Sequence, residues 1–349
     1  MNSQSVSRNI MATAVIIAAL IYFSDILKPL TLAIFLWFTI DGLAQFLHAR
    51  LPFVPRKAAV PFALLVVFVI LAFIVAFAAQ YVRNFSIDLT AYHARLDAML
   101  ATIYSMLPIG GPAPTIGEIF DKVSPSVILS GVGEVLTAFG EEALFVFIYV
   151  IGLFAAQAAL PKKILNMFPR KVDREHFVAI SSAIRTSIEQ YLLMQTIISI
   201  FVSILCWGLF VLLGLSNPFF WAIITFILTY IPVIGPWVAT LLPCLFALVQ
   251  FTTPIPAVLI LVVTHAIQFV AANFVQPRMA GDSLNISALV IFISLAFWGK
   301  IWGGEGMFLA VPLSVMLMIV LAQFNSTRNL AIMMSANGNP DVKIAPEAT

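Results

Sequence analysis

Long apolar runs fill most of this sequence and make a membrane the environment in which the chain can fold. Most of the runs reach the roughly 20 helical residues needed to cross a hydrocarbon core of about 30 Å. They cover residues 10–27, 29–47, 58–81, 139–160, 191–215, 218–231, 237–251, 256–275, 285–301 and 305–323. Charged residues are only 10% of the chain, against roughly 25% in a soluble protein. The sequence therefore predicts an all-α, polytopic integral membrane protein.

Two of these runs, 218–231 and 237–251, are too short to cross and flank the letters PVIGP. At 1.5 Å per residue each reaches only about 21 to 23 Å, which favours a hairpin that enters the membrane and turns back. Pro232, Gly235 and Pro236 interrupt the helix, and each backbone group left unpaired in lipid costs several kcal/mol. Secondary transporters bind substrates at helix breaks of this kind. Alternatively, the two prolines only shape helix packing.

Polar residues also collect in the segment THAIQFVAANFVQPRMAGDSLN. A helix through it places several of them on or near one face, and these are Thr264, His265, Gln268 and Gln276, with Asn273 adjacent. Pro277 is expected to end this helix, because its ring removes a donor and clashes one turn back, and Ser283 lies in the turn that follows. We expect a second broken hairpin over 257–301 with a polar wall. Hydrogen bonding between helices, without any substrate, is the alternative.

Sequence patterns of soluble enzymes are absent from the chain. The Gly299–Lys300 pair lacks the earlier glycine of a P-loop, and neither H-E-x-x-H nor G-x-S-x-G occurs. The four histidines lack metal-ligand spacing, and the two cysteines lie in apolar runs. A net charge of +2 is too small to suggest a nucleic-acid surface. We expect no enzymatic activity, no cofactor, no metal and no nucleic-acid partner.

Basic residues cluster in two loops that have the same parity in the predicted topology. They are Arg50, Arg56 and Lys57 in the first, and Lys162, Lys163, Arg170, Lys171 and Arg174 in the second. The positive-inside rule places both loops in the cytoplasm, and both termini with them. Near the opposite side, Gly303, Gly304 and Gly306 precede the last run. There Glu305 is expected to form a solvated pair with Lys300.

The chain divides into six predicted regions, with about eight transmembrane helices plus Pro/Gly-broken or re-entrant hairpins. The regions are N-terminal transmembrane helices 1–3 (1–82), a small extracytoplasmic helical insert (83–138), transmembrane helix 4 (139–160), a basic cytoplasmic loop and interfacial helix (161–190), a transport core with broken hairpins 218–251 and 257–301 (191–325), and a cytoplasmic tail (326–349). An apolar seam over 89–106 marks the insert as a packing layer or as an oligomer contact, so a homo-oligomer is expected.

Three motifs distinguish this sequence from a generic set of spanning helices: YIPVIGP, NFVQPRMAGDSLN and WGKIWGGEGMFLAVPLSVML. Together they resemble the autoinducer-2 exporter family, also called PerM-type permeases, and the similarity extends over nearly the whole chain. The resemblance implies a bacterial inner-membrane secondary transporter, whose family is associated with export of the quorum-sensing signal autoinducer-2 and in some members with Na⁺/H⁺ exchange. Ala271 and Ala272 stand where an acidic residue is common in the family.

Taken together, these features favour a permease that exports a small polar solute, similar to autoinducer-2, by alternating access. The predicted substrate-binding residues are Gln195, Tyr230, Pro232, Gly235, Pro236, Gln268, Asn273, Gln276, Pro277 and Ser283. Membrane lipid and H⁺ or Na⁺ as coupling ion are the other expected partners. A Na⁺/H⁺ antiporter is the alternative, although its candidate ionisable groups, Asp25, Asp41, Glu189, Asp282 and Glu305, all fall near segment ends. A passive channel or scaffold is the last alternative.

Overall fold

The computed structural model describes residues 3–50, 58–70, 142–280 and 285–340, with a few further positions between 72 and 97. Ser283 and nearly all of the predicted insert lie outside the described residues. Apart from one isolated bridge between Ile286 and Ser335, the regular elements of the described part are helices. The all-α class is confirmed for this part of the chain.

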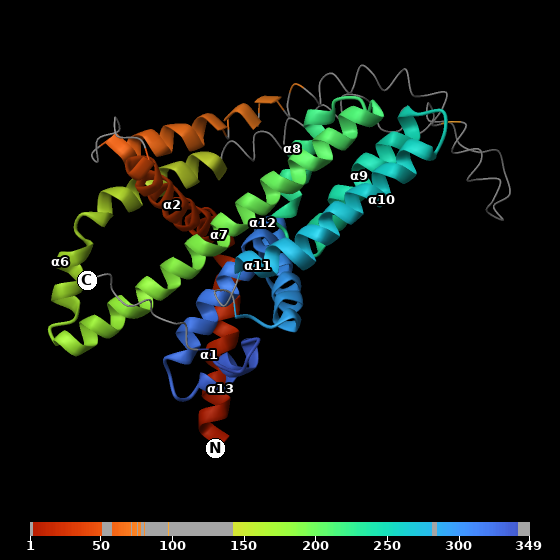
Figure 1. Cartoon of the computed structure of the whole chain (residues 1–349). Coiled ribbons are helices and arrows are strands. Elements are labelled where there is room, and N and C mark those ends of the chain that lie inside the picture. Colours follow the sequence, from red (N-terminus) through yellow and green to blue (C-terminus); the bar gives the residue numbers. More distant parts are fainter. Residues whose placement is uncertain are drawn as a thin grey trace. The chain divides into compact units, whose positions relative to one another are not determined.

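The described helices follow one another along the chain as Figure 1 shows. They are α1 (Ser3–Tyr22), α2 (Ser24–Arg50), a helix through 58–70, a helix over Glu142–Gln157, α6 (Leu160–Met167), α7 (Lys171–Leu213), α8 (Pro218–Thr229), α9 (Ile234–Gln250), α10 (Ile255–Val270), the π-helical turn η1 (Ala271–Val275), α11 (Gln276–Ala280), α12 (Ala288–Ala322) and α13 (Arg328–Met334).

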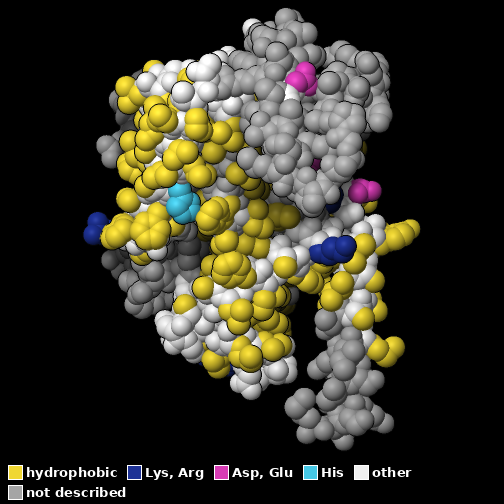
Figure 2. All heavy atoms as spheres, turned by 90° about the vertical axis from the view of Figure 1, so that its right-hand side faces the viewer, with side chains coloured by type: hydrophobic (Ala, Val, Ile, Leu, Met, Phe, Trp, Pro, Cys, Tyr) yellow, Lys and Arg dark blue, Asp and Glu magenta, His cyan; other side chains and the backbone are white. Residues whose placement is uncertain are grey.

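Four of the described helical stretches are long and apolar enough to cross a membrane: Ser24–Ala44 of α2, α7, Ile255–Met279 and α12. A fifth is added if Glu142–Gln157 and α6, bent by 66° relative to each other, form one broken span. Apolar side chains dominate the face shown in Figure 2. The chain thus has the helices of a membrane protein, but the predicted number of about eight spans is not confirmed.

The helices divide into two compact units. Unit 1 contains Met1–Leu64, Ala143–Ile197 and Phe274–Thr349, and unit 2 contains Leu65–Glu142 and Ile198–Asn273. Helix α7 contributes residues to both, and the boundary near residue 273 falls within η1. The six regions predicted from the sequence are not tested by this division and stay predictions.

Helix α7 joins two segments that the sequence analysis treats separately, the interfacial helix and the span that follows it. No proline occurs between Lys171 and Leu213, so no missing backbone amide interrupts the hydrogen bonds of the helix. The helix ends at Gly214, whose φ of 72° lets the amides of Gly214 and Leu215 bond back to the carbonyls of Val211 and Phe210. This is a Schellman motif, and it turns the chain sharply into α8.

Helix α12 is a folded hairpin, although its helical turns continue with little interruption. Gly303 has non-helical angles (φ 68°, ψ −142°). The Ser314 hydroxyl donates to the Ser294 hydroxyl at 2.7 Å, whereas twenty residues of straight helix would separate the two by about 30 Å. The two arms therefore fold back at Gly303, which lies between the apolar runs 285–301 and 305–323.

Contacts with the N-terminal helices hold the tip of the α12 hairpin within unit 1. The Trp302 indole donates to the Leu20 carbonyl at 3.2 Å, and the Glu305 carboxylate lies 3.7 Å from the Lys28 ammonium. The expected pairing of Glu305 with Lys300 is therefore wrong. Sequence proximity suggested that pair, but the fold of the hairpin brings the start of α2 to Glu305 instead.

Candidate functional site

The turn between α8 and α9 in unit 2 is tight and held by its own backbone. Val233 has φ 64° and ψ −61°, and the Ile234 amide donates to the Pro232 carbonyl at 2.7 Å. Together these define a γ-turn of the rare, strained form with positive φ. The predicted break in the helix at PVIGP is confirmed, and α8 and α9 form a hairpin.

Gly235 is required by this turn because there is no room for a side chain. A Cβ placed there would lie 1.7 Å from the carbonyl oxygen of Leu228. The Gly235 amide donates to the Ile231 carbonyl at 3.0 Å. With the Ile234 amide also bonded and Pro236 lacking one, the first three residues of α9 have no unpaired backbone amide. The backbone groups that the helix break would leave unpaired in lipid are therefore satisfied within the turn at these positions.

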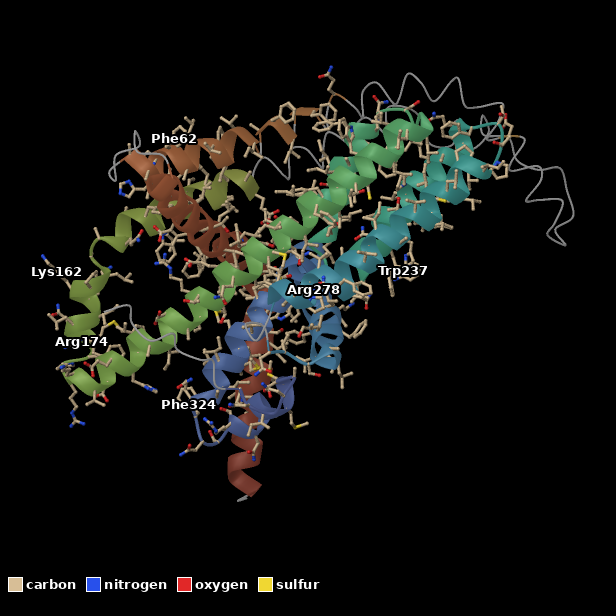
Figure 3. All side chains as sticks on the ribbon, viewed as in Figure 1. Phe62, Lys162, Arg174, Trp237, Arg278 and Phe324 are labelled. Carbon is tan, nitrogen blue, oxygen red and sulfur yellow. The ribbon has the colours of Figure 1, made fainter. Side chains whose placement is uncertain are left out.

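Helix α10 packs beside α9 and passes the α8–α9 turn. Helices α9 and α10 pack against each other, antiparallel, and lie alongside one another in Figure 1. The rings of Trp237 and His265 stand 4.7 Å apart. Gly235 lies two residues before Trp237 on α9 and Gln268 three residues after His265 on the antiparallel α10, about 3 Å and 4.5 Å along the two axes, so Gln268 lies near the level of Gly235. His265 is exposed beside Trp237, which projects outward in Figure 3, so His265 lies on the surface of the hairpin and is not among the buried polar residues.

Four buried polar side-chain atoms of unit 2 are without a hydrogen-bond partner in the described part of the chain, and one of them is the indole nitrogen of Trp221 on α8. The other three, on α7 and α10, form one set: the Ser199 hydroxyl on α7, the Thr264 hydroxyl on α10 and the side-chain amide nitrogen of Gln268. Ser199 and Thr264 are fully buried, and Gln268 is 4% exposed. Buried polar atoms are paired in folded proteins because an unpaired one costs roughly 1–3 kcal/mol. This set, which we call the polar face, is therefore suited to water or a polar ligand.

The polar face is assembled by the facing sides of α7 and α10. The Cys206 thiol approaches the Thr264 hydroxyl, which fixes the point where the two helices meet. Ser199 lies two turns before Cys206 on the same side of α7, and Gln268 lies one turn after Thr264. Since the two helices run in opposite directions, Ser199 and Gln268 lie on the same side of this contact.

The predicted site residues separate between the two units. Tyr230, Pro232, Gly235, Pro236, Gln268 and Asn273 belong to unit 2, whereas Gln195, Gln276 and Pro277 belong to unit 1. Tyr230 is half-buried, with its ring 5.4 Å from that of Phe226. The exposed Asn273 donates to its own helix, to the Phe269 carbonyl at 2.9 Å. Ser283 lies outside the described residues. Their joint role in binding stays a prediction.

The helix does not end at Pro277, which corrects another expectation. Helix α11 continues through Pro277 to Ala280. A proline clashes with the carbonyl four residues earlier, here that of Asn273, and this residue lies in the π-helical turn η1. The wider π-turn accommodates the ring without stopping the helix, as π-bulges do elsewhere.

Two sets of polar residues are missing from the sequence-based site, and the first is buried. Thr225 and Thr229 on α8, and Thr240 on α9, lie inside the hairpin and donate to carbonyls four residues earlier in their own helices. Their spacing of four in the sequence is the signal that could have placed Thr225 and Thr229 on one face. Ser199 has no comparable signal, because a lone serine in an apolar run does not indicate what it faces.

The second missing set is an ionic cluster in unit 1. Arg185 on α7 donates through Nε to the Glu189 carboxylate at 2.7 Å, and through Nη2 to the Asp41 carboxylate on α2. The spacing of Arg185 and Glu189 by four residues predicts their pairing. The approach of Asp41, 144 residues away in sequence, has no local signal.

Comparison with known proteins identifies the family to which this chain belongs. The sequence model of the AI-2E family transporter matches residues 10–326. This chain belongs to the AI-2E transporter family. It is similar to the AI-2 transport protein TqsA of Escherichia coli (strain K12), 28% identical over 324 residues that cover 92% of each chain. The putative transport protein YhhT of the same strain is 25% identical over 334 residues, covering 95% of this chain and 93% of its own. A putative transport protein of Haemophilus influenzae is 27% identical over 345 residues, covering 93% and 94%.

All three motifs that resemble the family coincide with irregular backbone. YIPVIGP forms the strained α8–α9 turn, NFVQPRM runs through η1 and α11, and WGKIWGGEG contains the fold of α12 at Gly303. Irregular helices at membrane depth persist where they line a cavity or are buried in protein. The motifs are therefore where this family member departs from simple spanning helices.

Proposed function

We propose that this AI-2E transporter is a secondary transporter that moves a small polar solute similar to autoinducer-2 outward across the bacterial inner membrane. The observation that carries the proposal is the polar face: Ser199, Thr264 and Gln268 each hold a buried polar atom without a partner in the described part of unit 2. A hydroxyl-rich solute can supply the missing hydrogen bonds. The name of the relative TqsA supports the choice of solute, since it is an AI-2 transport protein.

The α8–α9 turn supports alternating access in this proposal. A strained backbone next to an unsatisfied polar face is typical of functional sites that change conformation. The turn lies at the level of Gln268 within the same unit, so solute binding at Gln268 and rearrangement of the turn can be linked. The proposal requires no cofactor and no ATP hydrolysis by this chain.

We further propose the arrangement in the membrane, with both termini cytoplasmic. The side chains of Lys162 on α6 and Arg174 on α7 project from the ribbon in Figure 3, Lys162 exposed and Arg174 half-buried, which supports their place in a basic cytoplasmic loop. A homo-oligomer contacting through the insert is part of the same proposal.

Transport in liposomes tests the function. Labelled autoinducer-2 should exchange across liposomes containing the full chain faster than across empty ones. Gln268→Leu keeps the volume of the side chain but removes its donor, so the apparent affinity should fall about tenfold, as for one lost hydrogen bond of roughly 1.5 kcal/mol. Thr225→Val is the matched control, because Thr225 is equally buried but bonded within its own helix at 2.8 Å. Equal rates in protein-containing and empty liposomes would reject the proposal.

Sodium–proton exchange is the second candidate function, favoured by the Asp41–Arg185–Glu189 cluster in unit 1. A sodium pulse should then change the internal pH of the liposomes without any organic solute. This result, together with no exchange of labelled autoinducer-2, would replace the first proposal.

A further inference from the structure

Buried polar side chains occur along the whole length of the helices of unit 2. Large apolar side chains of the same helices, such as those of Leu205, Ile227 and Leu245, are exposed. Polar residues at membrane depth face the interior of a helix bundle or a water-filled cavity. The buried polar residues are Ser199 on α7, Thr225 and Thr229 on α8, Thr240 on α9, and Thr264 and Gln268 on α10.

The end of unit 2 that lies far from the strained α8–α9 turn is joined by Gln250, and we call it the Gln250 end. Helices α7 and α9 end there, and α8 and α10 begin. The Gln250 side chain accepts from the Ser216 amide at 2.7 Å and donates to the Gly214 carbonyl at 2.8 Å. Counted at 1.5 Å per residue from the start of its helix, Trp221 lies about 5 Å from this end, whereas Gln268 lies about 20 Å from it. Trp221 and the polar face are therefore at opposite ends of the unit.

Trp221 holds a buried hydrogen-bond donor that the described part of the chain does not satisfy. Its side chain is 9% exposed, and its indole nitrogen has no hydrogen-bond partner there. Tryptophan in membrane proteins normally directs this nitrogen to the interface, where water or lipid headgroups accept from it. The nitrogen of Trp221 is buried instead, so a position at the interface does not account for it.

Aromatic rings and a hydroxyl oxygen adjoin this donor. The Trp221 ring lies 5.1 Å from that of Phe246 on α9, with the two planes tilted by 37°. Such rings pack against the C–H groups of a sugar-like molecule, while the indole N–H donates to one of its oxygens. One turn along α8, the Thr225 hydroxyl donates to the Trp221 carbonyl at 2.8 Å, which leaves its oxygen able to accept. The group suits a ligand that has both C–H and hydroxyl surfaces.

The absence of charged residues from these helices determines the class of ligand. No Asp, Glu, Lys or Arg occurs between Ile198 and Asn273, a stretch that covers the unit 2 part of α7 and all of α8, α9 and α10. A charged ligand buried among these helices would lose its hydration without gaining an opposite charge. Hydrogen bonds and ring contacts remain, and they suit an uncharged, hydroxyl-rich molecule.

We propose that Trp221 forms a second solute subsite of unit 2, at the Gln250 end, where its indole N–H and the rings of Trp221 and Phe246 bind an uncharged, hydroxyl-rich solute. The proposal rests on the proposed transport function, because the solute is the one bound at the polar face. The two subsites lie about 15 Å apart along the helix axes, which is more than the length of a small solute. The solute therefore occupies them in turn.

Tryptophan fluorescence of the full chain in liposomes measures this subsite separately from transport. Autoinducer-2 should change the emission of the wild-type protein. Trp221→Phe keeps a ring but removes the donor, so most of the emission change should disappear, and the apparent affinity for exchange of labelled autoinducer-2 should fall about tenfold. Trp207→Phe is the matched control, since Trp207 lies on α7 in the same unit and is 44% exposed. This variant should keep both the emission change and the affinity.

Gln268→Leu distinguishes the two subsites. The solute concentration at half of the emission change should stay within about twofold of wild type in this variant, because residues this far apart act independently. A shift of about tenfold, equal to the one expected for exchange, would mean that Trp221 only reports binding at the polar face, and it would overturn the inference.

Two further results contradict the subsite: no emission change in the wild-type protein, or an emission change that Trp221→Phe retains in full. Should Trp221→Phe fail to fold, Phe246→Leu replaces it. Loss of one ring should raise the half-saturating solute concentration about threefold, and a wild-type value would count against the subsite. Equal exchange in protein-containing and empty liposomes rejects the transport function instead. The subsite is then judged by the emission titration alone, with the same loss expected in Trp221→Phe.

Discussion

Two tight hairpins, α8–α9 in unit 2 and α12 in unit 1, solve the same steric problem with different backbones. Each has a glycine whose Cβ would overlap a carbonyl oxygen, that of Leu228 at 1.7 Å for Gly235 and that of Trp298 at 2.0 Å for Gly306. In α12 the residue with positive φ is Gly303, but in α8–α9 it is Val233. A β-branched residue in this conformation is a genuine outlier.

The difference indicates which hairpin stores strain. Glycine adopts positive φ without steric cost, so the fold of α12 is relaxed at Gly303. Val233 in its γ-turn costs on the order of 1–3 kcal/mol, which the rest of the α8–α9 hairpin must offset. The strained hairpin lies at the level of the polar face, and strain of this kind is typical of sites that switch. The relaxed hairpin is held to α1 and α2 through Trp302 and Glu305.

The largest expected effect comes from adding a methyl group at either glycine that lies against a carbonyl oxygen, Gly235 or Gly306. Gly235→Ala and Gly306→Ala should each lower the free energy of unfolding by more than about 3 kcal/mol, because backbone must move to admit the methyl group. Thermal unfolding in detergent measures the loss. Gly208→Ala and Gly304→Ala are the matched controls, since a Cβ at either glycine meets nothing within 4 Å. Equal melting of Gly235→Ala and Gly208→Ala would show that the turn is looser than described.

A smaller effect is expected from the hydroxyl pair that joins the arms of α12. Ser314→Ala should cost about 1–3 kcal/mol, because it leaves the buried Ser294 hydroxyl without this partner. Adding Ser294→Ala should cost less than a second loss of the same size. The corresponding arms of α8–α9 meet through the rings of Trp221 and Phe246, 5.1 Å apart. A strictly additive double variant would mean that the two serines do not act as a pair.

Exchanging the residue types at positive φ sharpens the comparison further. Val233→Gly should raise the melting temperature or leave it unchanged, since relief of strain, up to about 1 kcal/mol, opposes the greater freedom of glycine in the unfolded chain. Transport should fall in the same variant, because the turn loses its fixed conformation. Gly303→Ala should lower the melting temperature, because alanine is strained at the positive φ of this position. The contrast disappears if Val233→Gly transports at the wild-type rate.

The smallest effect is expected for the contact that holds the α12 tip. Lys28 and Glu305 are 26% and 31% exposed, so their ion pair is worth less than about 1 kcal/mol. Lys28→Met should shift the melting temperature only slightly, and the shift should shrink with added salt. A large, salt-independent loss would show that the pair anchors the relaxed hairpin more firmly than its exposure suggests.

The hairpins also show how far the sequence predicts this molecule. Pro232, Gly235 and Gly303 mark both breaks correctly, because local backbone chemistry decides them. Pro277 misleads, because the π-turn before it is set by the surrounding helix and has no signature in single residues. Two of the three residues of the polar face, Thr264 and Gln268, are predicted by their helical spacing in the sequence. Ser199 is not, because its place beside them depends on how α7 packs. The approach of Asp41 to Arg185 depends on tertiary structure alone.

The account depends most on solute binding at the polar face beside the strained turn, and hydrogen–deuterium exchange of the purified protein tests this directly. Addition of autoinducer-2 should slow amide exchange in two segments of unit 2, residues 230–237 and 264–270, and Gln268→Leu should reduce this protection while Thr225→Val retains it. Unchanged exchange in both segments, with protection appearing elsewhere in the chain, would contradict the assignment of the site.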